Sequence, residues 1–207
     1  MSIDDQLLEA ARATVRAEAA AVAAVADQLD ESFLSVYRLL LETTGKVFIV
    51  GSGTSGTIAR RMAHLLSVCG TPAAFLHPMD ALHGTMGVLA AGDVLITISK
   101  GGETAEINDL IVLAKRRNVH VVSLTSAPQG TMARLSDTVV TVQIAPGADP
   151  GNVIAMGSTL VTAVWGDALA LLLMRQRGYS WDQMLETHPG GAVGLMSASP
   201  EALPPIS

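Results

Sequence analysis

Short apolar runs alternate along this chain with longer segments in which apolar residues recur every three or four positions. The runs predict five β-strands, at residues 47–50, 73–76, 93–99, 120–125 and 138–144. The longer segments predict helices at about 55–68, 104–117 and 156–176, with short helices near 132–135 and 180–186. Because strands that alternate with helices form a sheet covered on both faces, the pattern predicts an α/β fold. We expect a three-layer αβα sandwich with a five-stranded, mostly parallel, doubly wound sheet.

Two helical segments precede the first strand and are not part of a minimal doubly wound unit. Residues 4–26 are rich in Ala, Glu and Arg, and residues 30–42 carry an apolar stripe. We expect these helices to pack on a partner chain or across the sheet. We expect one domain over residues 1–207, with N-terminal helices at 1–45, the sheet core at 46–194 and a loose tail at 195–207.

The first predicted strand runs directly into the glycine-rich loop Gly51-Ser52-Gly53-Thr54-Ser55-Gly56, and a helix follows. Such a junction aims free backbone N–H groups and the positive end of a helix dipole at one point, which makes an anion site, most often for a phosphate. Three interpretations remain open: a dinucleotide site, a site for a small phosphate ester, and a tight turn with no ligand. The second strand ends in His77-Pro78 and not in the carboxylate that dinucleotide folds place there, whereas the loop hydroxyls suit a phosphate ester.

Two further loops leave predicted strand ends with small and polar residues. Ser99-Lys100-Gly101-Gly102-Glu103-Thr104 repeats the design of strand end, glycines and helix start, and residues 77–87 follow the second strand. Since the carboxyl ends of parallel strands meet at one edge of a sheet, we expect these loops to share a ligand. The shared target is one phosphate, held by backbone N–H groups and by the hydroxyls of Ser55, Ser99 and Thr104.

The charge, hydrophobic content and cysteine content of the chain limit the kinds of partner and compartment that we expect. A net charge of −6 argues against a nucleic-acid surface. The chain is 49% hydrophobic and 15% charged, which argues against disorder and indicates that other subunits cover apolar surface, as in a dimer or tetramer. The single cysteine, Cys69, fits a reducing, cytoplasmic compartment, and the acidic start shows no signal peptide.

Two further classes are disfavoured. Residues 153–174 are long and apolar, but Asp167 inside them favours a buried helix over a membrane span. The five histidines have no Cys or carboxylate partner at ligand spacing, so we expect no metal, and we expect no cofactor.

Several short motifs occur in the same order as in one known family. They are GSGTSG at 51–56, HPxDAxHGxxG at 77–87, SKGGETAE at 99–106, Ser158-Thr159, GDAL at 166–169 and HPGG at 188–191. Over residues 46–194 the chain resembles the sugar isomerase (SIS) domain family. HPGG together with the 77–87 run is similar to its arabinose-5-phosphate isomerase branch. Many members of that branch carry a pair of CBS domains after HPGG, and we expect none in this chain.

The resemblance implies interconversion of D-arabinose 5-phosphate and D-ribulose 5-phosphate through a cis-enediol. That chemistry needs a base that moves a proton between adjacent carbons and an acid that serves the oxygens. Glu106 matches a glutamate implicated in catalysis, His188 matches a histidine that a neighbouring subunit delivers, and His83 is a second acid/base candidate. The phosphate-binding candidates are Gly53, Thr54, Ser55, Ser99, Gly101, Gly102, Glu103 and Thr104. The substrate-binding candidates are His77, Asp80, Lys100, Ser158 and Thr159.

The chain departs from the family pattern at several polar positions. Thr54 replaces a lysine that is tied to substrate binding and catalysis, and Gly147 stands where the family has a second glutamate. Lys100 and Gly101 replace an amide and a hydroxyl residue. We hypothesise that Lys100 supplies the positive charge that Thr54 cannot, and that Asp149 partly replaces the lost glutamate.

These observations leave three functions, in order of preference. The first is an aldose–ketose isomerase for this or a different sugar phosphate. The second is a non-catalytic phosphosugar sensor, which the missing lysine and glutamate favour and the retained Glu106, His83 and His188 disfavour. The third is a dinucleotide-binding oxidoreductase, which the end of the second strand disfavours.

Overall fold

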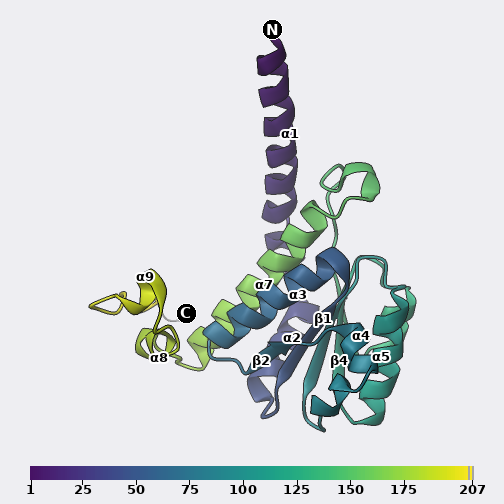
Figure 1. Ribbon diagram of the computed structural model, residues 1–207, viewed down its shortest axis with the longest axis vertical. Coiled ribbons are helices and arrows are strands. Elements are labelled where there is room, and N and C mark those ends of the chain that lie inside the picture. The colour runs from purple at the N-terminus through teal and green to yellow at the C-terminus, as the bar shows by residue number, and fades with distance from the viewer. Residues whose placement is uncertain (205, 207) are drawn as a thin grey trace.

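The structure is a computed structural model that describes residues 1–204 and 206 (Figure 1). Its centre is one sheet of five strands in the order β2-β1-β3-β4-β5. The strands are β1 Val47–Gly51, β2 Ala73–Phe75, β3 Val94–Ile98, β4 His120–Thr125 and β5 Thr138–Thr141. The predicted α/β fold with five strands is confirmed, and the sheet that we expected to be mostly parallel is parallel throughout. The fifth strand ends at Thr141, before the predicted residue 144.

Helices cover both faces of the sheet and make the predicted three layers (Figure 1). On one face, α2 Glu31–Glu42, α3 Gly53–Val68 and α7 Gly157–Gln176 share a core cluster with Ile49 and Ile96. On the other face, α4 Pro78–Leu82, α5 Ala105–Arg116 and α6 Thr131–Leu135 share a cluster with Val50 and Leu95. Alternate residues of β1 and β3 therefore point into opposite layers. Every residue of these two strands is buried, as a parallel strand with helices on both faces requires.

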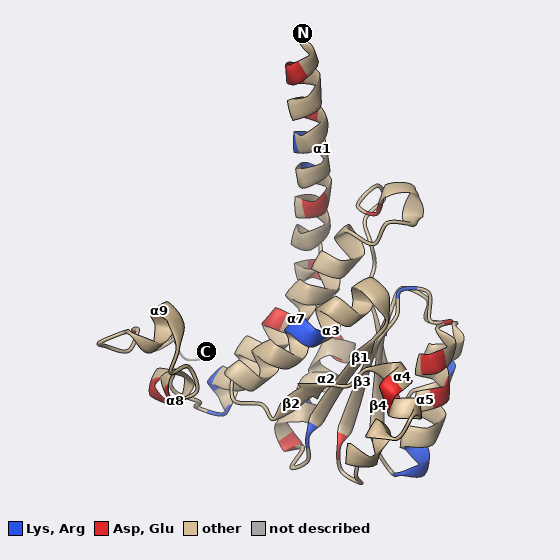
Figure 2. Cartoon of the chain, viewed as in Figure 1, with Lys and Arg blue, Asp and Glu red and all other residues tan. Residues whose placement is uncertain are grey.

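α7 is the long apolar helix that resembles a membrane span. Within the structure 61% of its most apolar 18-residue window is buried, so it is a core helix, as predicted. Trp165 near its centre is 2% exposed and packs edge-on against Phe33 of α2, with ring centroids 5.4 Å apart. Asp167 lies at the surface of this helix and pairs with Arg61 of α3 through two hydrogen bonds, one of 2.9 Å. Figure 2 shows the opposite charges side by side where the two helices meet.

The two N-terminal helices have different surroundings. α2 packs across the sheet face through Phe33, Val36 and Leu40, so this part of the prediction is confirmed. α1 Ile3–Ala23 projects from the body (Figure 1), and of its residues only Ala21 is buried. Its exposed large apolar side chains are Ile3, Leu7, Leu8 and Val15. Packing of α1 on a partner chain stays a prediction.

Two short helices continue the chain after α7. α8 Trp181–Glu186 and α9 Gly191–Gly194 lie beyond the far end of α7, away from the edge at which the strands end (Figure 1). The tail turns back on α8, where the indole N–H of Trp181 donates to the carbonyl oxygen of Glu201 at 3.0 Å. Residues 205 and 207 of the predicted loose tail lie outside the described residues, and the domain division stays a prediction.

Two of the loop glycines are needed for the junction between β1 and α3. A Cβ atom on Gly51 would lie 2.6 Å from the carbonyl oxygen of Ser55, and one on Gly56 would lie 2.8 Å from the carbonyl oxygen of Gly51. These glycines therefore allow the strand and the helix to approach closely. Gly53 has a φ of +55°, in the left-handed region that favours glycine. The glycine pattern thus follows from local packing and does not by itself indicate a ligand.

We expect Gly56→Ala to lower the free energy of unfolding by about 1–2 kcal/mol, the overpacking cost less the gain in helix propensity. The added methyl group meets backbone atoms, which cannot move as a flexible side chain can. Gly87→Ala is the matched control, because a Cβ there meets no atom within 4 Å and should change stability by less than about 0.5 kcal/mol. Urea denaturation measures both variants, and equal stabilities would contradict the tight junction.

Candidate functional site

The order of the strands changes direction between β1 and β3. The chain leaves β1 into α3 on one face of the sheet and leaves β3 into α5 on the other face. This arrangement puts one helix N-terminus on each side of the switch point, the usual ligand position in open α/β sheets. The first N–H groups of each helix have no partner within that helix, so both helices direct donors and a positive dipole end toward this edge.

The residues in position to cap α3 and α5 do not cap them. Ser52 and Thr104 occupy the N-cap positions, but neither side chain bonds to the backbone N–H groups of its helix. Ser2, Asp30 and Ser180 do make such bonds at the starts of α1, α2 and α8. A missing N-cap bond costs a helix about 1 kcal/mol. The donors left free at α3 and α5 are those that an anion site needs.

Hydrogen bonds within the loop between β3 and α5 hold its shape. The hydroxyl oxygens of Ser99 and Thr104 lie 2.9 Å apart, and Ser99 Oγ also accepts from the N–H of Gly102 at 3.2 Å. Thr125 at the end of β4 donates to the carbonyl oxygen of Lys100 at 3.1 Å. The structure thus brings the two predicted hydroxyls together on a loop that is fixed before a ligand binds.

Gly101 and Glu103 of the same loop have different surroundings. A Cβ on Gly101 would meet no atom within 4 Å, so the backbone there is open to a ligand. The Glu103 carboxylate instead accepts from the N–H of Thr131 at the start of α6, at 2.8 Å, and this bond holds its pKa below the ordinary value. The structure therefore places the Glu103 side chain at α6, although the sequence grouped it with the phosphate loop.

A small hollow lies beside this loop, between α3 and α7. Its wall includes four predicted residues: Ser55, Lys100, Ser158 and Thr159. The hollow is also lined by the hydroxyls of Thr125 and Ser126 at the end of β4, which were not predicted as site residues. Polar residues at the end of a buried strand were the signal that could have found them. The exposed Thr54, in the first turn of α3, does not line this hollow.

Lys100 and Asp149 form an ion pair at the wall of the hollow. Lys100 Nζ lies 2.7 Å from Asp149 Oδ2 and 3.3 Å from the carbonyl oxygen of Asn152, and the carboxylate is fully buried. The other carboxylate oxygen accepts from the N–H groups of Met156 and Ser158, each at 2.9 Å. Burial raises the pKa of Asp149, but Lys100 and the N–H groups outweigh it and hold the pKa below its ordinary value. This saturated carboxylate argues against the hypothesis that Asp149 replaces a catalytic glutamate.

Glu106 stands in the first turn of α5, outside the wall of the hollow. Its Oε1 accepts from Ser52 Oγ at 2.6 Å, and this bond is the main cause that holds the pKa of the Glu106 carboxyl below its ordinary value. Nearby His77, at the start of α4, lowers that pKa further. Because β2, β1 and β3 are neighbours, His77, Ser52 and Glu106 follow their three strands along one edge. Ser52 was predicted only as one of the loop hydroxyls suited to a phosphate ester, and its contact with Glu106 was not predicted.

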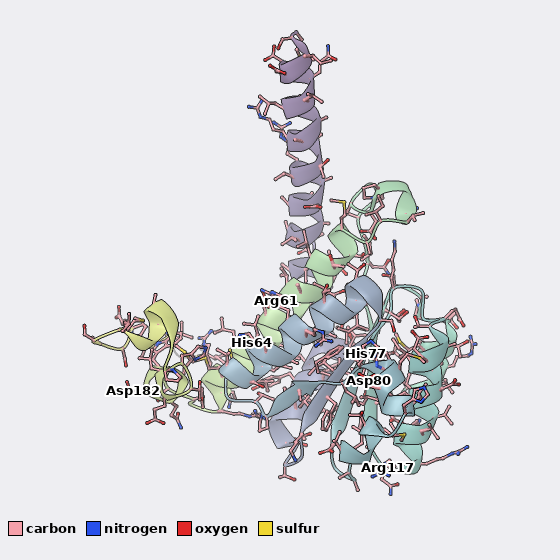
Figure 3. All side chains as sticks on the ribbon, in the orientation of Figure 1. Arg61, His64, His77, Asp80, Arg117 and Asp182 are labelled. Atoms are coloured by element: carbon pink, nitrogen blue, oxygen red, sulfur yellow. The ribbon has the colours of Figure 1, made fainter. Side chains whose placement is uncertain are left out.

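His77, directly before α4, and Asp80 in its first turn lie together (Figure 3). His77 Nδ1 is 3.9 Å from Asp80 Oδ2, too far for a hydrogen bond. This nitrogen is buried and has no other partner among the residues that the structure describes, whereas the Asp80 side chain is 75% exposed. Buried polar atoms in folded proteins are almost always bonded, so a ligand atom is a suitable partner for this nitrogen.

Comparison with known proteins establishes the family. The family model described as SIS domain matches residues 40–172 of this chain. The chain belongs to the SIS domain family. Among curated relatives, the arabinose 5-phosphate isomerase KdsD of Pseudomonas aeruginosa is 36% identical over 194 residues, which are 94% of this chain and 60% of that protein. The arabinose 5-phosphate isomerase KpsF of Escherichia coli is 34% identical over 194 residues, 93% of this chain and 61% of that protein. The chain thus spans about three fifths of the length of these relatives.

Solved structures share the fold of this SIS domain over most of its length. A Listeria monocytogenes protein provisionally assigned as a sugar-phosphate isomerase has a TM-score of 0.87 and 34% identity, covering 92% of this chain and 100% of that chain. The Escherichia coli CFT073 protein c3406, solved in complex with arabinose 5-phosphate, has a TM-score of 0.86 and 32% identity, covering 91% and 100%. The resemblance that the motifs indicated is confirmed for the family.

The two other acid/base candidates of this SIS domain are held less closely. His83 ends α4 with an exposed side chain. His188 follows α8, where its Nδ1 lies 2.9 Å from the carbonyl oxygen of Met184. Figure 3 shows Asp182 of the same helix far from His77, so within one chain this segment does not approach the edge that carries Glu106. Delivery of His188 by a neighbouring subunit stays a prediction.

We expect Lys100→Ala to lower the free energy of unfolding by about 2 kcal/mol at neutral pH. Removing one partner of a fully buried pair costs about 3–5 kcal/mol, but the Lys100 side chain is 35% exposed and water screens the pair. In the wild type, the lowered pKa of Asp149 contributes stability above the ordinary pKa of aspartate, and this contribution is lost as the pH falls through the lowered value. The difference in unfolding free energy between the wild type and the variant should therefore be smaller in acid, because a protonated Asp149 needs no cation.

Lys115→Ala is the matched control, since its 2.7 Å pair with Asp137 is more exposed. It should cost less than about 1 kcal/mol. Urea denaturation of both variants from neutral pH to below the ordinary aspartate pKa of about 3.9 measures the two costs. If the loss of unfolding free energy in Lys100→Ala does not change with pH, the charge of Asp149 is not its cause.

Proposed function

We propose that this SIS domain is an aldose–ketose isomerase for a phosphorylated sugar of the arabinose 5-phosphate and ribulose 5-phosphate type, acting through a cis-enediol. One observation carries the proposal: the Glu106 carboxylate is held at the edge where two uncapped helix N-termini meet. An anchored phosphate and a base close to it are what this reaction requires. The names of KdsD and KpsF, and the arabinose 5-phosphate bound to c3406, support the choice of sugar.

The phosphate binds to the free N–H groups at the starts of α3 and α5 and to the hydroxyls of Ser55, Ser99 and Thr104. The backbone of Gly53, Gly101 and Gly102 carries no side chain that would keep it away. Binding energy from this remote group positions the sugar carbons, so it lowers the barrier of a step in which the phosphate takes no part.

Glu106 removes the proton from the carbon next to the aldehyde and returns it to the aldehyde carbon, which gives the ketose. A glutamate carboxyl with a pKa below its ordinary value is ionised at neutral pH and in mild acid, and the ionised form is the one that a base needs. The sugar oxygens exchange their protons with an acid, for which His83 and the His188 of a second copy are the candidates.

The remaining candidates bind the sugar on two sides. His77, whose Nδ1 has no partner among the described residues, and Asp80 bind the sugar from the start of α4. Ser158 and Thr159 do so from the wall of the hollow.

Lys100 is the cation that this chain offers to the phosphate. An ammonium group has three N–H donors, and two of them point at Asp149 and at the carbonyl oxygen of Asn152. The third is available to a phosphate oxygen, and the 35% exposure of the side chain leaves room for that contact. This arrangement supports the hypothesis that Lys100 takes over the charge missing at Thr54.

A non-catalytic phosphosugar sensor is the second candidate. The absence of a lysine at Thr54 and of a glutamate at Gly147 favours it. A sensor needs the N–H groups and hydroxyls that bind the phosphate, but it does not need an ionised carboxylate beside them. The two candidates therefore differ in what they predict for Glu106.

A second copy of the chain is part of the proposed enzyme. Exposed apolar side chains on one helix favour burial against a partner, and α1 presents Ile3, Leu7, Leu8 and Val15 to solvent. His188 lies on a segment that extends away from its own sheet edge. A homo-oligomer in which this segment reaches the site of a neighbouring chain accounts for both features.

We expect Glu106→Gln to reduce kcat by about 10²–10⁴-fold with little change in KM, because the amide keeps the shape of the side chain but cannot accept the proton. A panel of pentose and hexose phosphates, followed by NMR in D2O, measures both turnover and the solvent deuterium that an enediol mechanism incorporates. Binding of a sugar phosphate without conversion by the wild type would favour the sensor. Undiminished turnover of Glu106→Gln would exclude Glu106 as the base.

We expect an equal mixture of Glu106→Gln and His188→Ala chains to regain activity that neither variant has alone. If each site combines residues from two chains, random pairing restores about a quarter of the wild-type sites. Coexpression, with turnover measured on the purified mixture, tests this. Failure to regain activity in a mixed oligomer would place His188 and Glu106 of each site on the same chain or leave His188 out of the chemistry.

A further inference from the structure

The contact between Ser52 and Glu106 is the feature from which a further role follows. Ser52 directly follows β1, and Glu106 lies in the first turn of the helix after β3, so their 2.6 Å hydrogen bond spans the switch point of the sheet. The residues are 54 positions apart in the chain. An O–H group that donates to a carboxylate at this distance makes a charge-assisted bond, which is stronger than a bond between neutral groups.

Ser52 makes this bond in place of one that its position favours. A serine at an N-cap normally accepts from the N–H groups of the first helical turn, as Ser2 and Ser180 do in this chain. Ser52 turns its hydroxyl to Glu106 and leaves the N–H groups of α3 free. One residue therefore frees donors for an anion and fixes a carboxylate in the first turn of α5, the helix that follows the adjacent strand β3.

We propose that Ser52 is a positioning residue for the Glu106 carboxylate. It occupies Oε1, so Oε2 is the oxygen that accepts the substrate proton. It also holds the side chain in one rotamer at the edge beyond β1, next to the first turn of α3, where the phosphate binds. The catalytic part of this inference rests on the proposed isomerase function, while the pairing of the two residues does not.

The same bond favours the ionised carboxylate over the neutral one. The hydrogen bond from Ser52 is the main cause of the lowered pKa of Glu106. A base that stays ionised in mild acid keeps its activity there, so Ser52 extends the active pH range of the protein toward acid. A serine that merely tied two loops together would stabilise the fold but would not set this range.

Three variants separate the two roles. Ser52→Ala removes the hydroxyl, and Ser52→Thr restores it on a backbone that is extended at this position, where Thr is well tolerated. Ser67→Ala is the matched control: it removes a hydroxyl from α3 that donates to the carbonyl oxygen of Ala73, at the other end of the helix. Thermal unfolding of all three variants shows whether each is folded at the assay temperature, so that unfolding is not mistaken for a loss of catalysis.

In Ser52→Ala we expect kcat to fall about tenfold with KM changed less than about twofold, because the base is present but no longer held. The acid limb of the pH profile of kcat/KM in Ser52→Ala should move to higher pH. In Ser52→Thr, kcat and the position of the acid limb should both lie close to the wild-type values. Ser67→Ala should match the wild type in kcat and in the acid limb. A loss confined to KM, or an acid limb that does not move, would overturn the proposal.

A direct titration tests the pairing without any turnover. Carbon-13 NMR of glutamate carboxyl groups, with the Glu106 signal identified by its absence in Glu106→Gln, follows the ionisation of this residue. We expect the pKa of Glu106 to be higher in Ser52→Ala than in the wild type. An unchanged titration overturns the inference even in an active enzyme. If the wild type converts no sugar phosphate, the proposed function fails, but a raised pKa in Ser52→Ala still establishes the pairing.

Discussion

Two neighbouring parallel strands that send their helices to opposite faces of the sheet are the constraint on which the rest of this structure depends. Crossovers between parallel strands are right-handed, so β1 and β3 cannot place α3 and α5 on the same side while the strand order runs outward in both directions. The starts of the two helices therefore face each other across the sheet edge. Every group assigned to the candidate site, except the distant His188, reaches it from a loop or helix that begins at this edge.

The site divides into two parts that share the phosphate loops. On the side of α3 and α7, Ser55, Lys100, Ser158 and Thr159 line the hollow. Toward α4 and α5, Glu106 is held near His77. A ligand whose phosphate lies on the uncapped helix starts has its other end free to reach either part. This arrangement suits a chain of sugar carbons, which needs an anchor at one end and chemistry at the other.

The expected departure from the SIS domain pattern at Gly147 has a structural reason in this chain. Gly147 has a φ of +81°, a left-handed conformation that a glutamate would adopt only with strain. The loop is instead fixed by Asp149, whose carboxylate is saturated by Lys100 and by two N–H groups. The loop in which the family resemblance led us to expect a second glutamate is thus built around an internal ion pair. The ammonium group of Lys100 at the wall of the hollow is one half of that pair.

The amino-acid sequence by itself determined the α/β class, the five strands, the core position of α7 and the two glycine loops, because periodic burial and helix starts are local properties of the chain. It also located Ser99 at a strand end, and Thr104 and Glu106 at the start of the helix that follows. Only the tertiary structure decided that Glu103 turns to α6, that Asp149 is buried and that Ser52 bonds to Glu106. These outcomes depend on which strands are neighbours, and that order, β2-β1-β3-β4-β5, joins residues that are far apart in the chain.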